Sequence, residues 1–213
     1  NSGCRGQGDR PFWDDDPQYD TPKKRGDLIS RLMVRQYELV KKYVENPVFC
    51  TNLYGETMEL YQQGFLTLPE DVITIWADNG YGKMVSRRQG NHNPRVPALP
   101  PAELRDGNHG TYYHVSFYDL QAANHITMLP NSMEFVEKEL KIAYDCGIKS
   151  LWVVNCSNVK PHVYPLDFIG NLWRGNSLTA EEHRRQDVES YYAYGQGIDG
   201  NDCMASLQGL FEA

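Results

Sequence analysis

Apolar and polar residues follow one another along the chain with periods that predict strands and helices in turn. Residues 72–76 are almost continuously apolar and β-branched, which is typical of a strand buried on both faces in a parallel sheet. Residues 151–154 have the same character and are also predicted as a buried strand. Shorter strands are predicted over residues 47–51 and over residues 112–118, where successive side chains alternate between two faces.

Between these strands the apolar residues recur at helical spacing. The longest such stretch predicts an amphipathic helix over residues 28–44, with Asp27 as its N-cap. Further helices are predicted over residues 52–61, stopped by Gly64; over residues 131–144, from a cap at Asn131 or Ser132 to Gly147; over residues 179–192, opened by a capping box; and over residues 202–213.

The order of elements is strand, helix, strand, helix, with polar residues after each strand. This order predicts an α/β fold with a parallel sheet. Four or five strands are too few to close an eight-stranded barrel, so they would form about half of a barrel or a small open sheet. Residues 83–110 show no apolar period and are predicted as a long loop.

Composition narrows the class of protein. With 213 residues, 40% of them hydrophobic, the chain can bury a core, and its net charge of −7 without a basic stripe argues against nucleic-acid binding. No apolar run is long enough to span a membrane. Five cysteines without a CxxC pair favour neither a zinc site nor a disulfide framework. Because the chain starts at Asn1 without a signal peptide, we expect a piece of a longer protein.

Two stretches carry candidate chemistry outside the strands. In residues 3–9, three glycines surround Arg5 and Asp9; the arginine offers a planar fork for a carboxylate, and the aspartate is a possible base. A flexible chain start with a surface ion pair explains the same residues. Glu56 falls in the first turn of a predicted helix, where a carboxylate is suited to chemistry but is also common as a partner of the helix dipole.

Polar side chains also follow the predicted strands. Parallel α/β proteins place ligand sites at the carboxyl ends of their strands, so these residues are candidates for binding. A histidine on a strand is more often structural than catalytic. The candidates are Asp78, Asn79 and Tyr81 after residues 72–76, His114 in residues 112–118, and Asn155 and Lys160 after residues 151–154.

Taken together, these strand ends resemble glycoside hydrolase family 115, the xylan α-glucuronidases. The similarity spans nearly the whole chain and weakens after Trp173. It is carried, in the order of the family, by residues 3–9 (GCRGQGD), 53–56 (LYGE), 71–79 (DVITIWADN), 110–114 (GTYYH) and 152–155 (WVVN) with Lys160 and Pro161.

The resemblance implies that residues 1–213 are the later part of a TIM-like (β/α) barrel, the catalytic domain of a larger multidomain protein. Family members remove glucuronic acid or its 4-O-methyl ether from α-1,2 linkages on xylan, with inversion. The resemblance implies a glucuronylated oligo- or polysaccharide as partner, no metal or organic cofactor, and a secreted or periplasmic protein. It leaves homodimerisation of the parent protein open.

The resemblance also implies roles for single residues. Glu56 takes the place of the proposed general acid, and Asp9 is the carboxylate that would activate water. Arg5 would grip the uronate carboxylate or pair with Asp9. Asn79 and His114 would hold sugar hydroxyls or position the water. The remaining substrate-binding candidates are Asp78, Tyr81, Asn155 and Lys160.

The chain departs from the family pattern at two strand ends. Residues 77–82 (ADNGYG) lack one carboxylate and contain an extra glycine, and residues 157–163 (SNVKPHV) replace two acidic positions. These changes leave two alternatives open. One is a glucuronidase for another polymer, such as arabinogalactan; the other is a non-catalytic carbohydrate-binding relative.

Overall fold

The computed structural model describes residues 10–86, 96–116, 131–193, 201 and 204–205. The chain divides into two units. The first takes the residues up to Asn79, then Met84–Tyr112 and Cys146–Val153. The second takes Gly80–Lys83, Tyr113–Asp145 and the residues from Val154 onward. Each unit is described below by itself.

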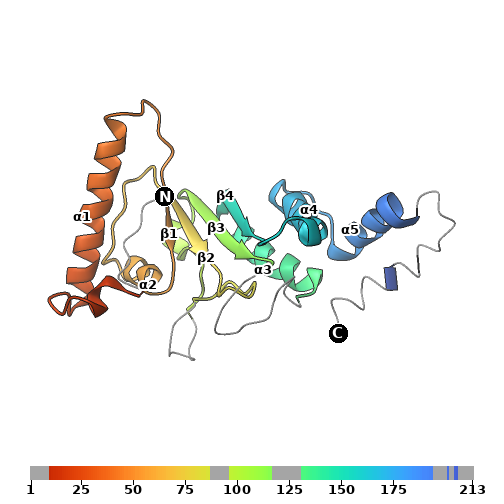
Figure 1. Ribbon diagram of the computed structural model, residues 1–213, viewed down its shortest axis with the longest axis horizontal. Helices are drawn as coiled ribbons and strands as arrows, with labels where there is room; N and C mark the ends of the chain where they lie inside the picture. The colour runs from red at the N-terminus through yellow and green to blue at the C-terminus, as the bar shows by residue number, and fades with distance from the viewer. Residues whose placement is uncertain (1–9, 87–95, 117–130, 194–200, 202–203, 206–213) are drawn as a thin grey trace. The chain divides into compact units, whose positions relative to one another are not determined.

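One four-stranded sheet organises the fold (Figure 1). Its strands are β1 (Cys50–Leu53), β2 (Ile73–Ala77), β3 (His109–His114) and β4 (Ile148–Asn155), hydrogen-bonded in the order β1-β2-β3-β4. The pairs β1–β2 and β2–β3 are parallel, and helices lie between the strands along the chain. The predicted α/β fold with a parallel sheet is therefore confirmed.

The first and third strands do not start where the sequence pattern placed them. β1 begins at Cys50 rather than at residue 47, and β3 runs from His109 rather than from residue 112. The start of β3 is fixed by contacts that strand propensity does not show. His109 accepts a hydrogen bond from Trp76 Nε1 (3.2 Å), and a Cβ on Gly110 would overlap the carbonyl of Leu151 on β4.

The fourth strand was predicted to be buried, and this prediction is wrong. Val153 is 38% exposed, and Leu151 and Trp152 are half-buried. The reason is its place in the sheet, because β4 comes last in the strand order and has β3 as its one neighbour among the described strands. The second strand behaves as predicted, with Ile75, Trp76 and Ala77 all buried.

The long helix α1 (Pro22–Lys41) starts earlier than predicted, and its N-cap is Thr21 rather than Asp27. The Thr21 hydroxyl accepts the backbone N–H of Lys24 (3.3 Å), and Pro22 supplies a φ angle suited to the first helical position. Asp27 instead forms an ion pair with Lys23 (2.9 Å) on the exposed surface of the helix. The helix ends at Lys41 rather than at residue 44.

One helix escaped prediction entirely, namely α4 (Val163–Trp173). Pro165 argues against a helix in the sequence, because proline usually ends one. It is tolerated here because it lies in the first turn, where a backbone N–H has no partner within the helix. The other helices are α2 (Glu56–Gln62), α3 (Met133–Asp145), α5 (Ala180–Asp187), a π-helical turn at Val188–Ala193 and short 3₁₀ turns at Phe12–Asp14, Ala102–Leu104 and Lys160–His162.

The predicted caps of the later helices are confirmed where the structure describes them. Ser132 accepts the N–H of Phe135 (3.2 Å) at the start of α3, and Gly147 follows that helix with a φ of +93°. Thr179 and Glu182 form the reciprocal capping box of α5. Most of residues 202–213, predicted as a last helix, lie outside the described residues.

In the second unit, α5 is tied to the helices that precede it. Arg184, 7% exposed, donates to Glu134 of α3 (2.6 Å), and His183 bonds Asp167 of α4 (2.9 Å). Burial of Glu134 disfavours its ionised form, but hydrogen bonds from its own backbone and from Arg184 outweigh this and lower its pKa. These pairs join three amphipathic helices around a core that contains Phe168.

Two findings bear on earlier expectations. Within the described part of the chain, no helix is long and apolar enough to cross a membrane. Cys50, Cys146 and Cys156 are free thiols, buried or half-buried. Cys4 and Cys203 lie outside the described residues.

Helix α1 packs against the segment after α2 through a glycine. A Cβ built on Gly26 would overlap the carbonyl oxygen of Phe65, whereas one on Gly170 of α4 would meet only the Arg174 guanidinium at 3.6 Å or more. We therefore expect Gly26→Ala to lower the free energy of unfolding by about 1–3 kcal/mol, because the backbone carbonyl cannot yield as a side chain can.

The matched control is Gly170→Ala. It should raise the free energy of unfolding by about 0.5–1 kcal/mol, since alanine favours helix and meets no backbone atom there. Urea unfolding of the two variants measures both changes. Equal changes in the free energy of unfolding for the two variants would contradict the close packing at Gly26.

Candidate functional site

The structure describes seven of the nine predicted site residues. Arg5 and Asp9 lie outside the described residues. The other seven fall on the two units. Glu56, Asp78 and Asn79 belong to the first, and Tyr81, His114, Asn155 and Lys160 belong to the second.

Glu56 is positioned by a tight turn between β1 and α2. Gly55 has φ +53° and ψ −114°, a conformation that glycine adopts far more readily than other residues. The Thr57 hydroxyl then closes the turn, because it accepts the N–H of Tyr54 (3.0 Å) and donates to the carbonyl of Tyr54 (2.9 Å). Glu56 is thus the first residue of α2, three positions after Leu53 at the end of β1.

The sheet register brings Glu56 to the same edge as two other candidates. β1 and β2 are parallel, and their last paired residues are Leu53 and Trp76. Residues 54–56, after β1, and residues 78–79, after β2, therefore follow the two strands at the same carboxyl edge of the sheet. This juxtaposition of Glu56 with Asp78 and Asn79 lies wholly within the first unit.

These three side chains differ in exposure. Asp78 is fully buried, and its N–H donates to the carbonyl of Tyr112 (3.1 Å), which extends the β2–β3 ladder by one bond. Glu56 and Asn79 are half-buried. A ligand at this edge can therefore reach Glu56 and Asn79, whereas Asp78 is placed to hold the strand end.

In the second unit, the ends of β3 and β4 are joined by one carbonyl. The carbonyl of Asn155 accepts the N–H groups of Val115 (3.0 Å) and Ser116 (3.3 Å). His114, 2% exposed, is the last residue of β3. Its burial suits a side chain that holds its neighbours. Asn155 is half-buried.

The turn after β4 contains a feature that the sequence analysis did not identify. Ser157 has a φ of +53°, the only positive φ at a non-glycine position among the described residues. Its N–H donates to Asn155 Oδ1 (3.3 Å), and its hydroxyl accepts from Ser116 (3.2 Å). A serine gives no sequence signal for this conformation, because glycine is the residue that favours it.

Two more candidates sit on turns of the second unit. Tyr81 lies between Gly80 (φ +88°) and Gly82 (φ +79°), and its carbonyl accepts a bond from Asn131 Nδ2 (2.8 Å). Lys160 is exposed at the start of a 3₁₀ turn. The extra glycine in this part of the sequence thus occupies a real turn.

Two side chains of the second unit have raised pKa values. Burial raises the pKa of Tyr164 to about 12 and also raises the pKa of Asp187. Within the described residues, no group of three or more histidine, cysteine or acidic side chains is arranged to hold a metal ion.

Comparison with known proteins decides the family. The family model described as glycosyl hydrolase family 115 matches residues 1–207. The chain belongs to glycosyl hydrolase family 115. A solved structure of this family superposes on it with a TM-score of 0.76 and 26% sequence identity. That structure is BtGH115A, a novel family GH115 4-O-methyl-α-glucuronidase with specificity for decorated arabinogalactans.

The match covers 98% of this chain and 26% of BtGH115A, so the chain spans about a quarter of that relative. A comparison with curated proteins finds no match. The family resemblance seen in the sequence is confirmed, and the parallel α/β sheet agrees with it.

The turn that positions Glu56 can be tested without changing its carboxylate. Thr57→Val keeps the shape of the side chain but removes both hydrogen bonds to Tyr54, so we expect the free energy of unfolding to fall by about 1–2 kcal/mol. Thr57→Ser keeps the hydroxyl and should lose less than half of that. Chemical denaturation of the full-length protein measures both variants, and equal losses would show that the hydroxyl does not hold the turn.

Proposed function

We propose that this chain is part of the catalytic domain of an α-glucuronidase, which releases glucuronic acid or 4-O-methylglucuronic acid from a polysaccharide. The observation that carries the proposal is the family match over residues 1–207. The likeness to BtGH115A, a 4-O-methyl-α-glucuronidase, supports it. The finer assignment, α-1,2 linkages on xylan-type polymer cleaved with inversion, rests on the family resemblance of the strand-end residues.

In this proposal Glu56 is the general acid that protonates the leaving oxygen. Two observations support the role. Glu56 is half-buried, and partial burial helps to keep an acid protonated near neutral pH. The Gly55 turn also holds it at the carboxyl edge of a parallel sheet, where catalytic groups of this fold class lie.

The second carboxylate of the proposal is Asp9. An inverting glycosidase needs two carboxyl groups about 6.5–9.5 Å apart, with room for the attacking water between them. Asp9 would activate that water, and Arg5 would bind the uronate carboxylate or pair with Asp9. Both roles are taken from the family pattern in residues 3–9.

The remaining candidates would bind the sugar or support those that do. Half-buried Asn79, Tyr81 and Asn155 and exposed Lys160 would contact the substrate directly. Asp78 and His114 are buried and would act as positioning residues, each at a strand end of its own unit.

Replacement of the proposed acid gives the sharpest test. Glu56→Gln keeps the size and hydrogen-bonding capacity of the side chain but cannot deliver the proton. We expect it to reduce release of glucuronic acid from glucuronylated xylo-oligosaccharides by about 10²- to 10⁴-fold. Chromatography of the products from the full-length protein measures the release.

Glu59→Gln is the matched control, since Glu59 is half-buried in the same first turn of α2. It should keep most of the activity. If Glu56→Gln remains fully active, Glu56 is not the acid. If the unaltered protein binds glucuronylated oligosaccharides in calorimetry but forms no product over days, the protein is a carbohydrate-binding relative rather than a hydrolase.

A second polymer has specific support. BtGH115A is specific for decorated arabinogalactans, and the chain replaces acidic positions of the family pattern at residues 77–82 and 157–163. Parallel assays on glucuronoxylan and on glucuronylated arabinogalactan separate the two substrates. Our first proposal predicts faster release from glucuronoxylan. Release from arabinogalactan alone would move the assignment to that polymer.

A further inference from the structure

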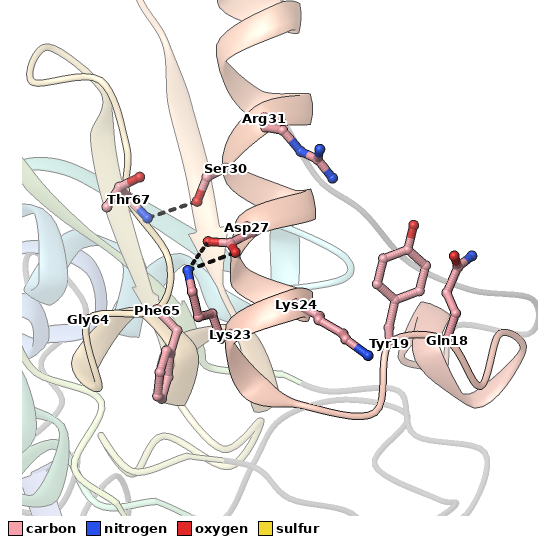
Figure 2. A pocket seen from close by; sticks show the side chains of 10 residues that line it. All are labelled: Gln18, Tyr19, Lys23, Lys24, Asp27, Ser30, Arg31, Gly64, Phe65 and Thr67. Carbon is pink, nitrogen blue, oxygen red and sulfur yellow. Dashed lines mark hydrogen bonds and ion pairs between the residues drawn. The ribbon is translucent and has the colours of Figure 1, made fainter.

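A cavity of about 870 Å³ lies beside the first half of α1, within the first unit (Figure 2). Three stretches of chain line it, namely Gln18 and Tyr19 before the helix, one face of α1 itself, and residues 64–67 between α2 and β2. None of the described residues assigned above to substrate or catalysis lines this cavity. Its size is in the range of ordinary ligand pockets.

The walls of the cavity are held in place by specific contacts. Ser30 donates to the carbonyl of Gly26 (2.7 Å) and accepts the N–H of Thr67 (3.0 Å), a bond drawn in Figure 2. Gly26 lets the helix approach the backbone of Phe65. On the other side, Arg25 Nε donates to the carbonyl of Tyr19 (2.7 Å). The three stretches are therefore fixed before any ligand arrives, which lowers the entropic cost of binding.

The charge of the lining is opposite to that of the chain. Lys23, Lys24 and Arg31 line the cavity with one acidic side chain, Asp27, whereas the whole chain carries a net charge of −7. Lys23 is paired with Asp27 (2.9 Å), and Lys24 with Asp20 (2.8 Å).

The Arg31 side chain has no ion pair or hydrogen bond within the described part of the chain. In Figure 2 its side chain extends from α1 toward the side on which Tyr19 lies. A free guanidinium in a locally positive cavity favours an anion, and its planar fork matches a carboxylate.

The rest of the lining is suited to a sugar rather than to a small inorganic ion. Tyr19 is half-buried and Phe65 is 37% exposed, and each contributes an aromatic ring to the lining. The Gln18 amide and the Tyr19 hydroxyl add groups that can both donate and accept. An inorganic anion bound at Arg31 would leave unused most of this volume and the Tyr19 ring, which lies on the same side of α1 (Figure 2).

From these contacts we infer that the cavity is a second carbohydrate-binding site, which holds a uronate-bearing sugar of the polymer through Arg31. The inference rests on the proposed function for the nature of the polymer. A chain bound at two places gains avidity without any new contact at the cleavage site.

The test compares Arg31→Gln with Arg35→Gln in the full-length protein. Arg35 is the matched control, since it is exposed one turn further along α1 and does not line the cavity. Retention in gels that contain glucuronoxylan or glucuronylated arabinogalactan measures the affinity for each polymer. Carboxyl-reduced forms of both polymers serve as uronate-free probes.

We expect Arg31→Gln to weaken retention by the polymer that the protein binds about fivefold, as for one exposed charged contact. Arg35→Gln should match the unaltered protein. Carboxyl reduction of the polymer should abolish the difference between the two variants. Equal retention of the two variants on the unreduced polymers, or no retention of the unaltered protein, would overturn the inference.

Failure of the proposed function has a separate signature. Release of glucuronic acid from a short oligosaccharide with a single uronate is measured on the unaltered protein alone. Absence of product there counts against the glucuronidase, whereas the comparison of Arg31→Gln with Arg35→Gln judges only the cavity.

Discussion

The parallel hydrogen bonding of β1 to β2 is the constraint on which the candidate site depends. With Leu53 opposite Trp76, the chain leaves both strands at the same edge of the sheet. The glycine conformation at Gly55 then turns the chain so that α2 starts at once, with Glu56 as its first residue. A shift of this pairing by one residue would exchange the faces on which all the side chains lie, and it would separate Glu56 from Asp78 and Asn79.

The strand order and the local turns therefore determine which candidates reach a ligand. Glu56 and Asn79 are half-buried, whereas Asp78 is inside. In the second unit, the backbone carbonyl of Asn155 joins the ends of β3 and β4. The Asn155 side chain accepts a hydrogen bond from the N–H of Ser157, so the turn at Ser157 sets its orientation. The division into contacting and supporting residues follows from burial, which residue type alone does not reveal.

Much of the fold could be predicted from sequence because local signals and tertiary contacts agree there. The apolar run of β2 and the capping box at Thr179 are such cases. Where contacts from distant segments decide, prediction failed. β3 starts at a histidine bonded to Trp76, β4 is exposed because it ends the strand order, and α4 tolerates a proline in its first turn.

The candidate site shows the same division. Glu56, Asn79 and Asn155 could be placed at strand ends from periodicity. The hydrogen bonds around Glu56 and Asn155, between Thr57 and Tyr54 and from Ser157 to Asn155, have no sequence signature, because a hydroxyl and a backbone N–H reveal their partners only in the fold. The cavity beside α1 was likewise not predictable, since it depends on segments that meet only after folding.

A structure of the full-length protein with a glucuronylated oligosaccharide bound tests the central claim most directly. The quantity to measure is the distance from the Glu56 carboxyl oxygens to the glycosidic oxygen of the bound sugar. Our account predicts about 2.6–3.2 Å, the reach of a general acid. A glycosidic oxygen lying more than about 6 Å from Glu56, with another carboxyl group in contact, would contradict it.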